Sequence, residues 1–132
     1  MDIRKAFGTR ADLENEGVWI DIGDGARIKV ARAGNRAHAE VIRRLRRQYQ
    51  ATRRGGKAAD DMLERLSVEA MAEAVLLDWQ GVEEGGAAVP YSLESAQRML
   101  TDYKDFRDMV AGFSTDMALF QEEEEAAAAK NS

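Results

Sequence analysis

The chain has 132 residues, no cysteine and a formal net charge of −5. This length suits one domain, and the lack of cysteine excludes a disulfide framework and thiolate chemistry. The longest apolar window, AEAVLLDW, is far shorter than the roughly 18–20 residues of a membrane span, and the N-terminus lacks the apolar region of a signal peptide. We therefore expect a cytoplasmic protein without a membrane contact.

Charge is distributed unevenly along the chain. Residues 27–57 carry 11 basic groups and one acid, whereas residues 58–132 carry 5 basic and 17 acidic groups. Such polarity favours an electrostatically steered contact with a partner or with a second copy. The alternative is a helix whose charged face is simply solvated.

The first regular pattern is the alternation of apolar and polar residues in GVWIDIGDGARIKVARAG. Asp24-Gly25 provides the tight reversal that hairpins favour, because both residues tolerate positive φ. We expect a two-stranded hairpin of Val18–Ile22 with Ala26–Ala31. An isolated hairpin is marginally stable in water, so this one must lie on helices or extend the sheet of a partner.

A basic helix follows, beginning at an Asn35 cap and ending near Thr52. Its apolar stripe consists of Ala37, Val41, Ile42, Leu45 and Tyr49. Most of its remaining circumference is formed by Arg43, Arg44, Arg46 and Arg47. These arginines are candidate partner contacts, either with an acidic surface or with phosphates. We favour a protein surface, because the chain is acidic overall and shows no convincing helix-turn-helix pair.

The core is expected in a second helix from about Ala58 to Trp79, since its second half is apolar on nearly all sides. A third helix starts at the Ser92 cap and continues the apolar seam by steps of three and four residues to Phe120. A break is expected at Gly112 and the cap-like residues 114–116. The seam residues are Ala96, Met99, Tyr103, Phe106, Val110, Phe113, Met117 and Phe120.

The predicted fold is mainly α within the α+β class: an N-terminal β-hairpin followed by a three- to four-helix bundle. Residues 1–121 are expected to form a single domain that includes the hairpin at 18–31. Residues 122–132, EEEEAAAAKNS, combine a charge run with low complexity and are predicted to be a flexible tail.

Residues that could carry catalysis are scarce. His38 is the single histidine, and without cysteine it forms neither a metal cluster nor a nucleophile–base pair. Glu83 and Glu84 beside two glycines lack the alternating ligands of a calcium loop, so solvated acids are the favoured interpretation. We predict no catalytic residue, cofactor or metal, and therefore no enzyme.

The segment LLDWQGVEEGGAAVPYSLESAQRML resembles the tail assembly chaperones of long-tailed (siphovirus-type) bacteriophages and prophages. That family tends to show Leu-x-Asp-Trp-x-Gly, a short acidic glycine-rich loop, and then Val-Pro-Tyr/Phe-Ser at the start of the next helix. The hairpin ahead of an arginine-rich helix and the acidic tail are also similar. The matching residues are Leu76, Asp78, Trp79, Gly81, Val89, Pro90, Tyr91 and Ser92.

Physical chemistry independently suggests a structural role for this segment. Trp79 can wedge between helices, Gly81 can end a helix in the left-handed conformation, and Pro90 keeps Val89 extended. Ser92 then begins the next helix as its cap. The segment is thus predicted to be a packed helix–loop–helix corner.

The resemblance implies a non-catalytic factor that binds and solubilises the largely helical tape measure protein and helps recruit the tail tube protein. It also implies a host-cytoplasm location, absence from the mature virion, and a longer form made by a −1 frameshift near Ala129-Lys130-Asn131. Alternatives are a nucleic-acid-binding or regulatory protein, and a structural tail or head–tail component. The predicted groove contact, unless these residues only complete the core, is Phe113, Met117, Leu119 and Phe120.

Overall fold

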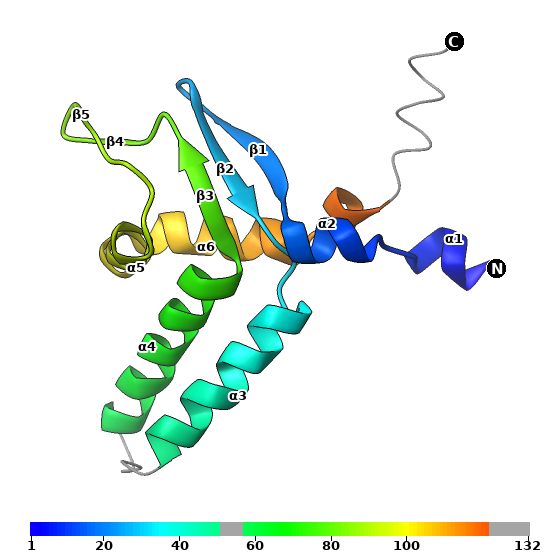
Figure 1. Cartoon of the computed structure of the whole chain (residues 1–132), viewed down its shortest axis with the longest axis horizontal. Helices are drawn as coiled ribbons and strands as arrows, with labels where there is room; N and C mark the ends of the chain where they lie inside the picture. Colours follow the sequence, from blue (N-terminus) through cyan, green and yellow to red (C-terminus); the bar gives the residue numbers. More distant parts are fainter. Residues whose placement is uncertain (51–56, 122–132) are drawn as a thin grey trace.

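A small antiparallel sheet packed on helices forms the body, and a pair of helices projects from it as an arm (Figure 1). The computed structural model describes residues 1–50 and 57–121. The α+β class is confirmed. The predicted tail, 122–132, lies outside the described residues.

The predicted hairpin is present as β1 (Val18–Gly23) and β2 (Ala26–Val30). Asp24 and Gly25 have φ of 54° and 77°, the two positive values that a tight hairpin turn of this type requires. The hairpin does not stand alone, because a third strand completes a sheet of order β1-β2-β3.

That third strand corrects the predicted helix end. The second helix was expected to reach Trp79, but α4 (Lys57–Ala74) stops earlier and Leu76–Gln80 form β3, antiparallel to β2. A buried helix and a strand covered by other elements are both apolar on most sides, so periodicity does not separate them. The open edge of β2 decides the outcome, because it supplies backbone hydrogen-bond partners that an isolated helix end lacks.

A register shift in β3 orients the core. Leu76 pairs with Val30 and Trp79 pairs with Ile28, so a step of three positions along β3 corresponds to a step of two positions along β2. Regular alternation would turn one of these side chains outward, and the irregularity at this point keeps both inside. Leu76, Val30 and Ile28 are fully buried and Trp79 is 4% exposed.

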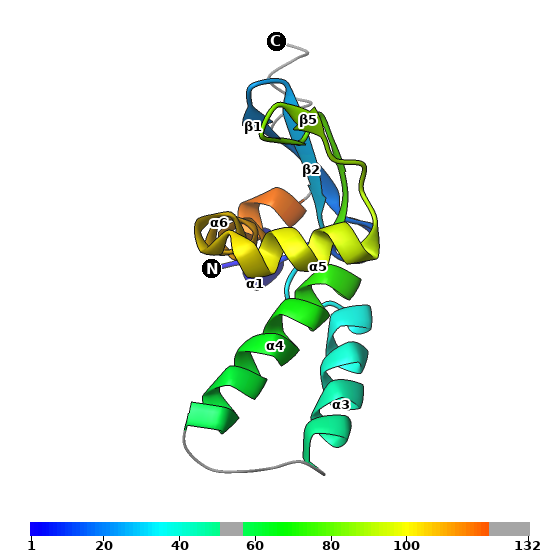
Figure 2. The same ribbon diagram turned by 90° about the vertical axis from the view of Figure 1, so that its left-hand side faces the viewer.

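The arm consists of α3 (Arg36–Gln50) and α4, which lie side by side in both views (Figures 1 and 2). Leu45, Leu66 and Ala70 form its own small buried cluster, separate from the main core. Asn35 caps α3 as predicted, since its Oδ1 accepts from the backbone N–H of His38 at 3.0 Å. Its Nδ2 also donates to the Ala74 carbonyl at 2.9 Å, which joins the base of α3 to the end of α4.

The C-terminal part is divided differently from the prediction. The single seam helix is interrupted at Tyr103, giving α5 (Leu93–Asp102) and α6 (Lys104–Ser114), which run in clearly different directions (Figures 1 and 2). Both helices bury their apolar faces against one core, so the spacing continues across the bend and conceals it. The predicted break at 114–116 is present, and Asp116 caps the 3-10 helix η1 (Met117–Phe120).

The helices therefore do not share one bundle core. Val68 and Ala72 of α4, with Val75 just after it, belong to the core formed with α5, α6 and the sheet, whereas Leu66 and Ala70 of α4 pack in the separate cluster with Leu45 of α3. Two short N-terminal helices, α1 (Ile3–Phe7) and α2 (Ala11–Glu16), were not predicted. Their few residues provide too little periodicity for detection.

Candidate partner-binding surfaces

The segment 76–92 folds as a strand, a small hairpin and a helix start, which corrects the predicted helix–loop–helix corner. The indole Nε1–H of Trp79 donates to the Val89 carbonyl at 2.7 Å, and its ring meets that of Tyr91 edge-on at 5.2 Å between centroids. The Tyr91 hydroxyl donates to the Leu76 carbonyl at 2.8 Å. Burial raises the pKa of Tyr91. These contacts fasten the returning chain onto β3.

Glycine geometry shapes the loop between these contacts. Gly81 ends a strand rather than a helix, but it does adopt the predicted left-handed conformation, with φ of 73°. A Cβ at this position would lie 2.5 Å from the carbonyl oxygen of Gly25, so the loop passes close to the β1–β2 turn. The loop then forms β4 (Glu83–Glu84) and β5 (Ala87–Ala88).

The start of α5 is fixed by the predicted cap. Ser92 and Ser95 form a reciprocal capping box, in which each side chain accepts from the other residue's backbone N–H. The Ser95 hydroxyl also donates to the Pro90 carbonyl at 3.0 Å. Asp78 stays local, because its Oδ1 accepts from the Trp79 N–H at 2.8 Å. The motif residues are thus brought together as a structural unit.

The four candidate arginines are exposed on α3, but they differ in their partners. Arg44 forms an ion pair with Glu73 of α4 at 2.6 Å. Arg43, Arg46 and Arg47 have no ion-pair partner among residues 1–50 and 57–121. Within the described residues, these three neighbouring arginines on α3 therefore present uncompensated positive charge to the solvent.

Next to this charge the arm contains an apolar hollow of about 380 Å³. Leu63 on α4, one of the lining residues, is 63% exposed and so offers apolar surface to a partner. The Tyr49 hydroxyl at its wall donates to Glu69 at 3.1 Å, and burial raises the Tyr49 pKa. The lining residues are Arg46, Tyr49, Gln50, Ala59, Met62, Leu63 and Leu66.

The predicted groove contact at the end of the chain is mostly internal. Phe120 is 0% exposed, and Phe113 packs partly buried against the main core. Met117 and Leu119 are half-buried. In this conformation Phe120 does not reach the surface, so for Phe113 and Phe120 the structure gives the core position that the sequence left as the alternative.

The acidic loop and the histidine have local partners. Glu84 accepts from the Tyr103 hydroxyl at 2.6 Å and from Arg98 at 3.0 Å, and these contacts lower its pKa, the Tyr103 hydrogen bond most strongly. His38 Nδ1 accepts from the Gly34 N–H at 2.8 Å, and burial lowers its pKa. In the part of the chain that the structure describes, no three His, Asp or Glu side chains are grouped to hold a metal ion.

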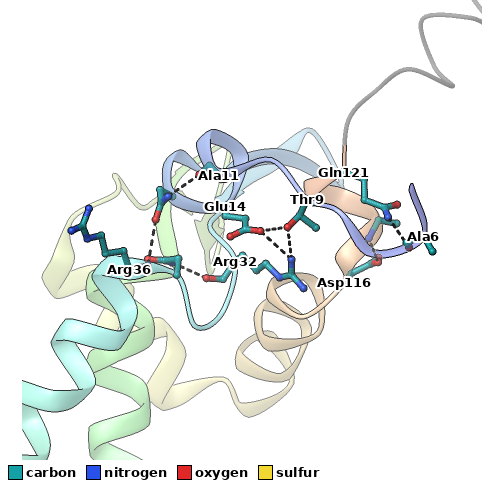
Figure 3. A network of polar contacts seen from close by, with 11 residues as sticks. Ala6, Thr9, Ala11, Glu14, Arg32, Arg36, Asp116 and Gln121 are labelled. Carbon is teal, nitrogen blue, oxygen red and sulfur yellow. Dashed lines mark hydrogen bonds and ion pairs between the residues drawn. The ribbon is translucent and has the colours of Figure 1, made fainter. Parts of the chain in front are cut away.

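A polar network that the sequence analysis missed fastens the N-terminal segment (Figure 3). Arg32, which follows β2, donates from Nη1 to Thr9 at 3.0 Å and to Glu14 at 3.2 Å, while Thr9 and Glu14 bond each other. The Arg10 N–H donates to the Phe120 carbonyl at 2.7 Å. Arg32 thus acts inside the fold, although its sequence position places it in the basic segment.

These features define a small α+β protein whose body carries a charged helical arm with an apolar hollow. The model of the YdaY prophage protein family matches residues 33–131. The chain therefore belongs to this family and is a phage or prophage protein. No curated protein and no solved structure matches it significantly.

The helices within the described residues include none that is long and apolar enough to cross a membrane.

Proposed function

We propose that this prophage protein is a non-catalytic tail assembly chaperone. In this role it binds the tape measure protein, keeps that helical protein soluble and helps recruit the tail tube protein. Membership of a prophage family and the motif at residues 76–92 support the proposal. The observation that carries it is the arm, where an apolar hollow is lined by Arg46, one of three α3 arginines that have no ion-pair partner among the described residues.

Such a surface suits an amphipathic helix. An apolar stripe on the partner would enter between α3 and α4 and cover Leu63, while acidic residues beside that stripe would meet the arginines. We place the contact here rather than at η1, because the buried Phe120 leaves little apolar surface to offer there.

Leu63→Asp is expected to weaken capture of the tape measure protein about tenfold, since burying a leucine contributes about 1.5–3 kcal/mol and 1.4 kcal/mol corresponds to tenfold in affinity. The measurement is co-expression with the neighbouring large helical gene product, followed by pull-down and titration. Leu93→Asp on α5 is the matched control, because Leu93 is also exposed, at 47%. Equal binding by both variants would exclude the hollow as the binding site. If the unaltered chain does not capture the tape measure protein, the chaperone function itself is excluded.

The proposed location is the bacterial host cytoplasm during assembly, and the mature virion would lack the protein. Mass spectrometry of purified phage particles measures whether the protein is present in the virion, and we expect it to be absent. Stoichiometric amounts in the particle would indicate a structural tail or head–tail component instead.

A nucleic-acid-binding or regulatory role is the second candidate, favoured by the same three arginines, which could neutralise phosphates. A gel-shift assay distinguishes it from the first, because phosphate-driven binding falls steeply between low and moderate salt. Shifts of that kind in the absence of any protein partner would support the second candidate.

A longer form would provide the contact with the tail tube protein. Ala129-Lys130-Asn131, which lies outside the described residues, can be encoded by GCA-AAA-AAC, and this contains the slippery heptamer A-AAA-AAC. We expect the gene to contain this heptamer and an open −1 frame past Ser132, which nucleotide sequencing reads directly. Synonymous codons that break the heptamer would rule out this route.

A further inference from the structure

A cavity of about 660 Å³ opens at the end of the body away from the arm, between the β1–β2 turn, the β4–β5 hairpin and the α5–α6 junction. Its floor is apolar and includes Ile22, Val82, Met99 and Phe106. Tyr103 lies at this junction and is 45% exposed. The cavity is therefore large enough to admit several side chains of a partner.

The wall of this cavity is acidic. Asp24, Glu83, Glu84 and Asp105 line it, and no basic residue does so among the described residues. Glu84 is already engaged by Arg98 and Tyr103. The other three carboxylates have no ion-pair partner within the described ranges 1–50 and 57–121.

The three carboxylates of the cavity are opposite in charge to Arg43, Arg46 and Arg47, the three α3 arginines that have no ion-pair partner among the described residues and lie closest to the middle and end of the helix. The two surfaces lie at opposite ends of the molecule, with the arm on one side of the core and the tips of the β-hairpins on the other (Figures 1 and 2). One copy therefore does not join its own arm to its own cavity. A second copy can instead place its arm against the cavity of the first.

We propose that copies of this chain associate head to tail, with the arginine face of α3 in one copy docking at the acidic cavity of the next. The arginine stems cover the apolar floor while their guanidinium groups pair with the carboxylates. Because the two contacting surfaces are different, the contact is heterologous and builds rings or open chains rather than a closed two-fold dimer. This inference does not rest on the proposed function. Because both contacts would use Arg43, Arg46 and Arg47, a tape measure segment and a second copy would compete for the arm, so the experiments use the purified chain alone.

Salt provides the first measurement. The association is expected in sedimentation velocity at about 0.01 M salt, where the Debye length is about 30 Å, and is expected to be lost at about 1 M, where that length is about 3 Å. A chain that is monomeric at low salt, or whose mass distribution is indifferent to salt, overturns the proposal.

Two neutralised variants provide the second measurement. The arm variant carries Arg43→Gln, Arg46→Gln and Arg47→Gln, and the cavity variant carries Asp24→Asn, Glu83→Gln and Asp105→Asn. Asparagine suits position 24, where φ is 54°. Each variant alone is expected to be monomeric, because it lacks one half of every contact.

An equimolar mixture of the two variants is expected to form dimers and nothing larger. The intact arm of the cavity variant binds the intact cavity of the arm variant. The neutralised surfaces at the two ends of this dimer cannot bind a further copy. The control neutralises Arg4 and Lys5, two exposed cations outside both surfaces, and is expected to keep the association. Urea midpoints confirm that all variants fold. A mixture that stays monomeric, or single variants that still associate, overturns the head-to-tail contact.

Discussion

Trp79→Ala is expected to lower the free energy of unfolding by about 3–5 kcal/mol, a large fraction of the 5–15 kcal/mol typical of a domain. The indole is 4% exposed, so truncation leaves a cavity in the main core. It also removes the hydrogen bond to the Val89 carbonyl and the edge-on contact with Tyr91. A urea titration measures the loss.

Trp19→Ala is the matched control for this experiment. Trp19 lies on β1 of the same sheet, is only partly buried, and has the guanidinium carbon of Arg27 4.9 Å from its ring centroid. Its truncation opens no internal cavity and is expected to have a clearly smaller effect. A loss under about 1 kcal/mol for Trp79→Ala, a value typical of average substitutions, would mean that the tryptophan does not anchor the loop.

Gly81→Ala is also expected to lower the free energy of unfolding, by less than Trp79→Ala. A left-handed backbone costs a non-glycine residue about 1–3 kcal/mol, and here the added Cβ would also lie 2.5 Å from the Gly25 carbonyl oxygen. Either the loop or the β1–β2 turn must shift. The change is therefore expected to reduce stability and to disturb the cavity at that end of the body.

Gly85→Ala separates the cost of the left-handed backbone from the cost of the steric clash. Gly85 also has positive φ, 58°, but among the described residues no atom lies within 4 Å of its added Cβ. It is expected to show the backbone cost alone, and the difference between the two variants in urea titration reports the clash. Equal losses would contradict the close approach of Gly81 to Gly25.

The sequence by itself determined the features that depend on neighbouring residues. Asp24-Gly25 fixes the hairpin turn, and Asn35 and Ser92 cap the helices that follow them. Each depends on chemistry within about four residues, so no distant contact is needed to establish it. The burial of Trp79 was also predictable, because a large ring within an apolar run is buried in a strand as well as in a helix.

Only the tertiary structure decided the features that depend on distant partners. Leu76–Gln80 became a strand because β2 offered an open edge, and Tyr103 bends the seam because α5 and α6 cover the same core. Distant contacts also separate the arginines, because Arg32 donates to Thr9 and Glu14, while Arg43 has no ion-pair partner among residues 1–50 and 57–121. Composition does not distinguish the two arginines. Whether an arginine holds the fold together or is available to a partner depends on the residues that lie near it in space, and sequence periodicity does not show those neighbours.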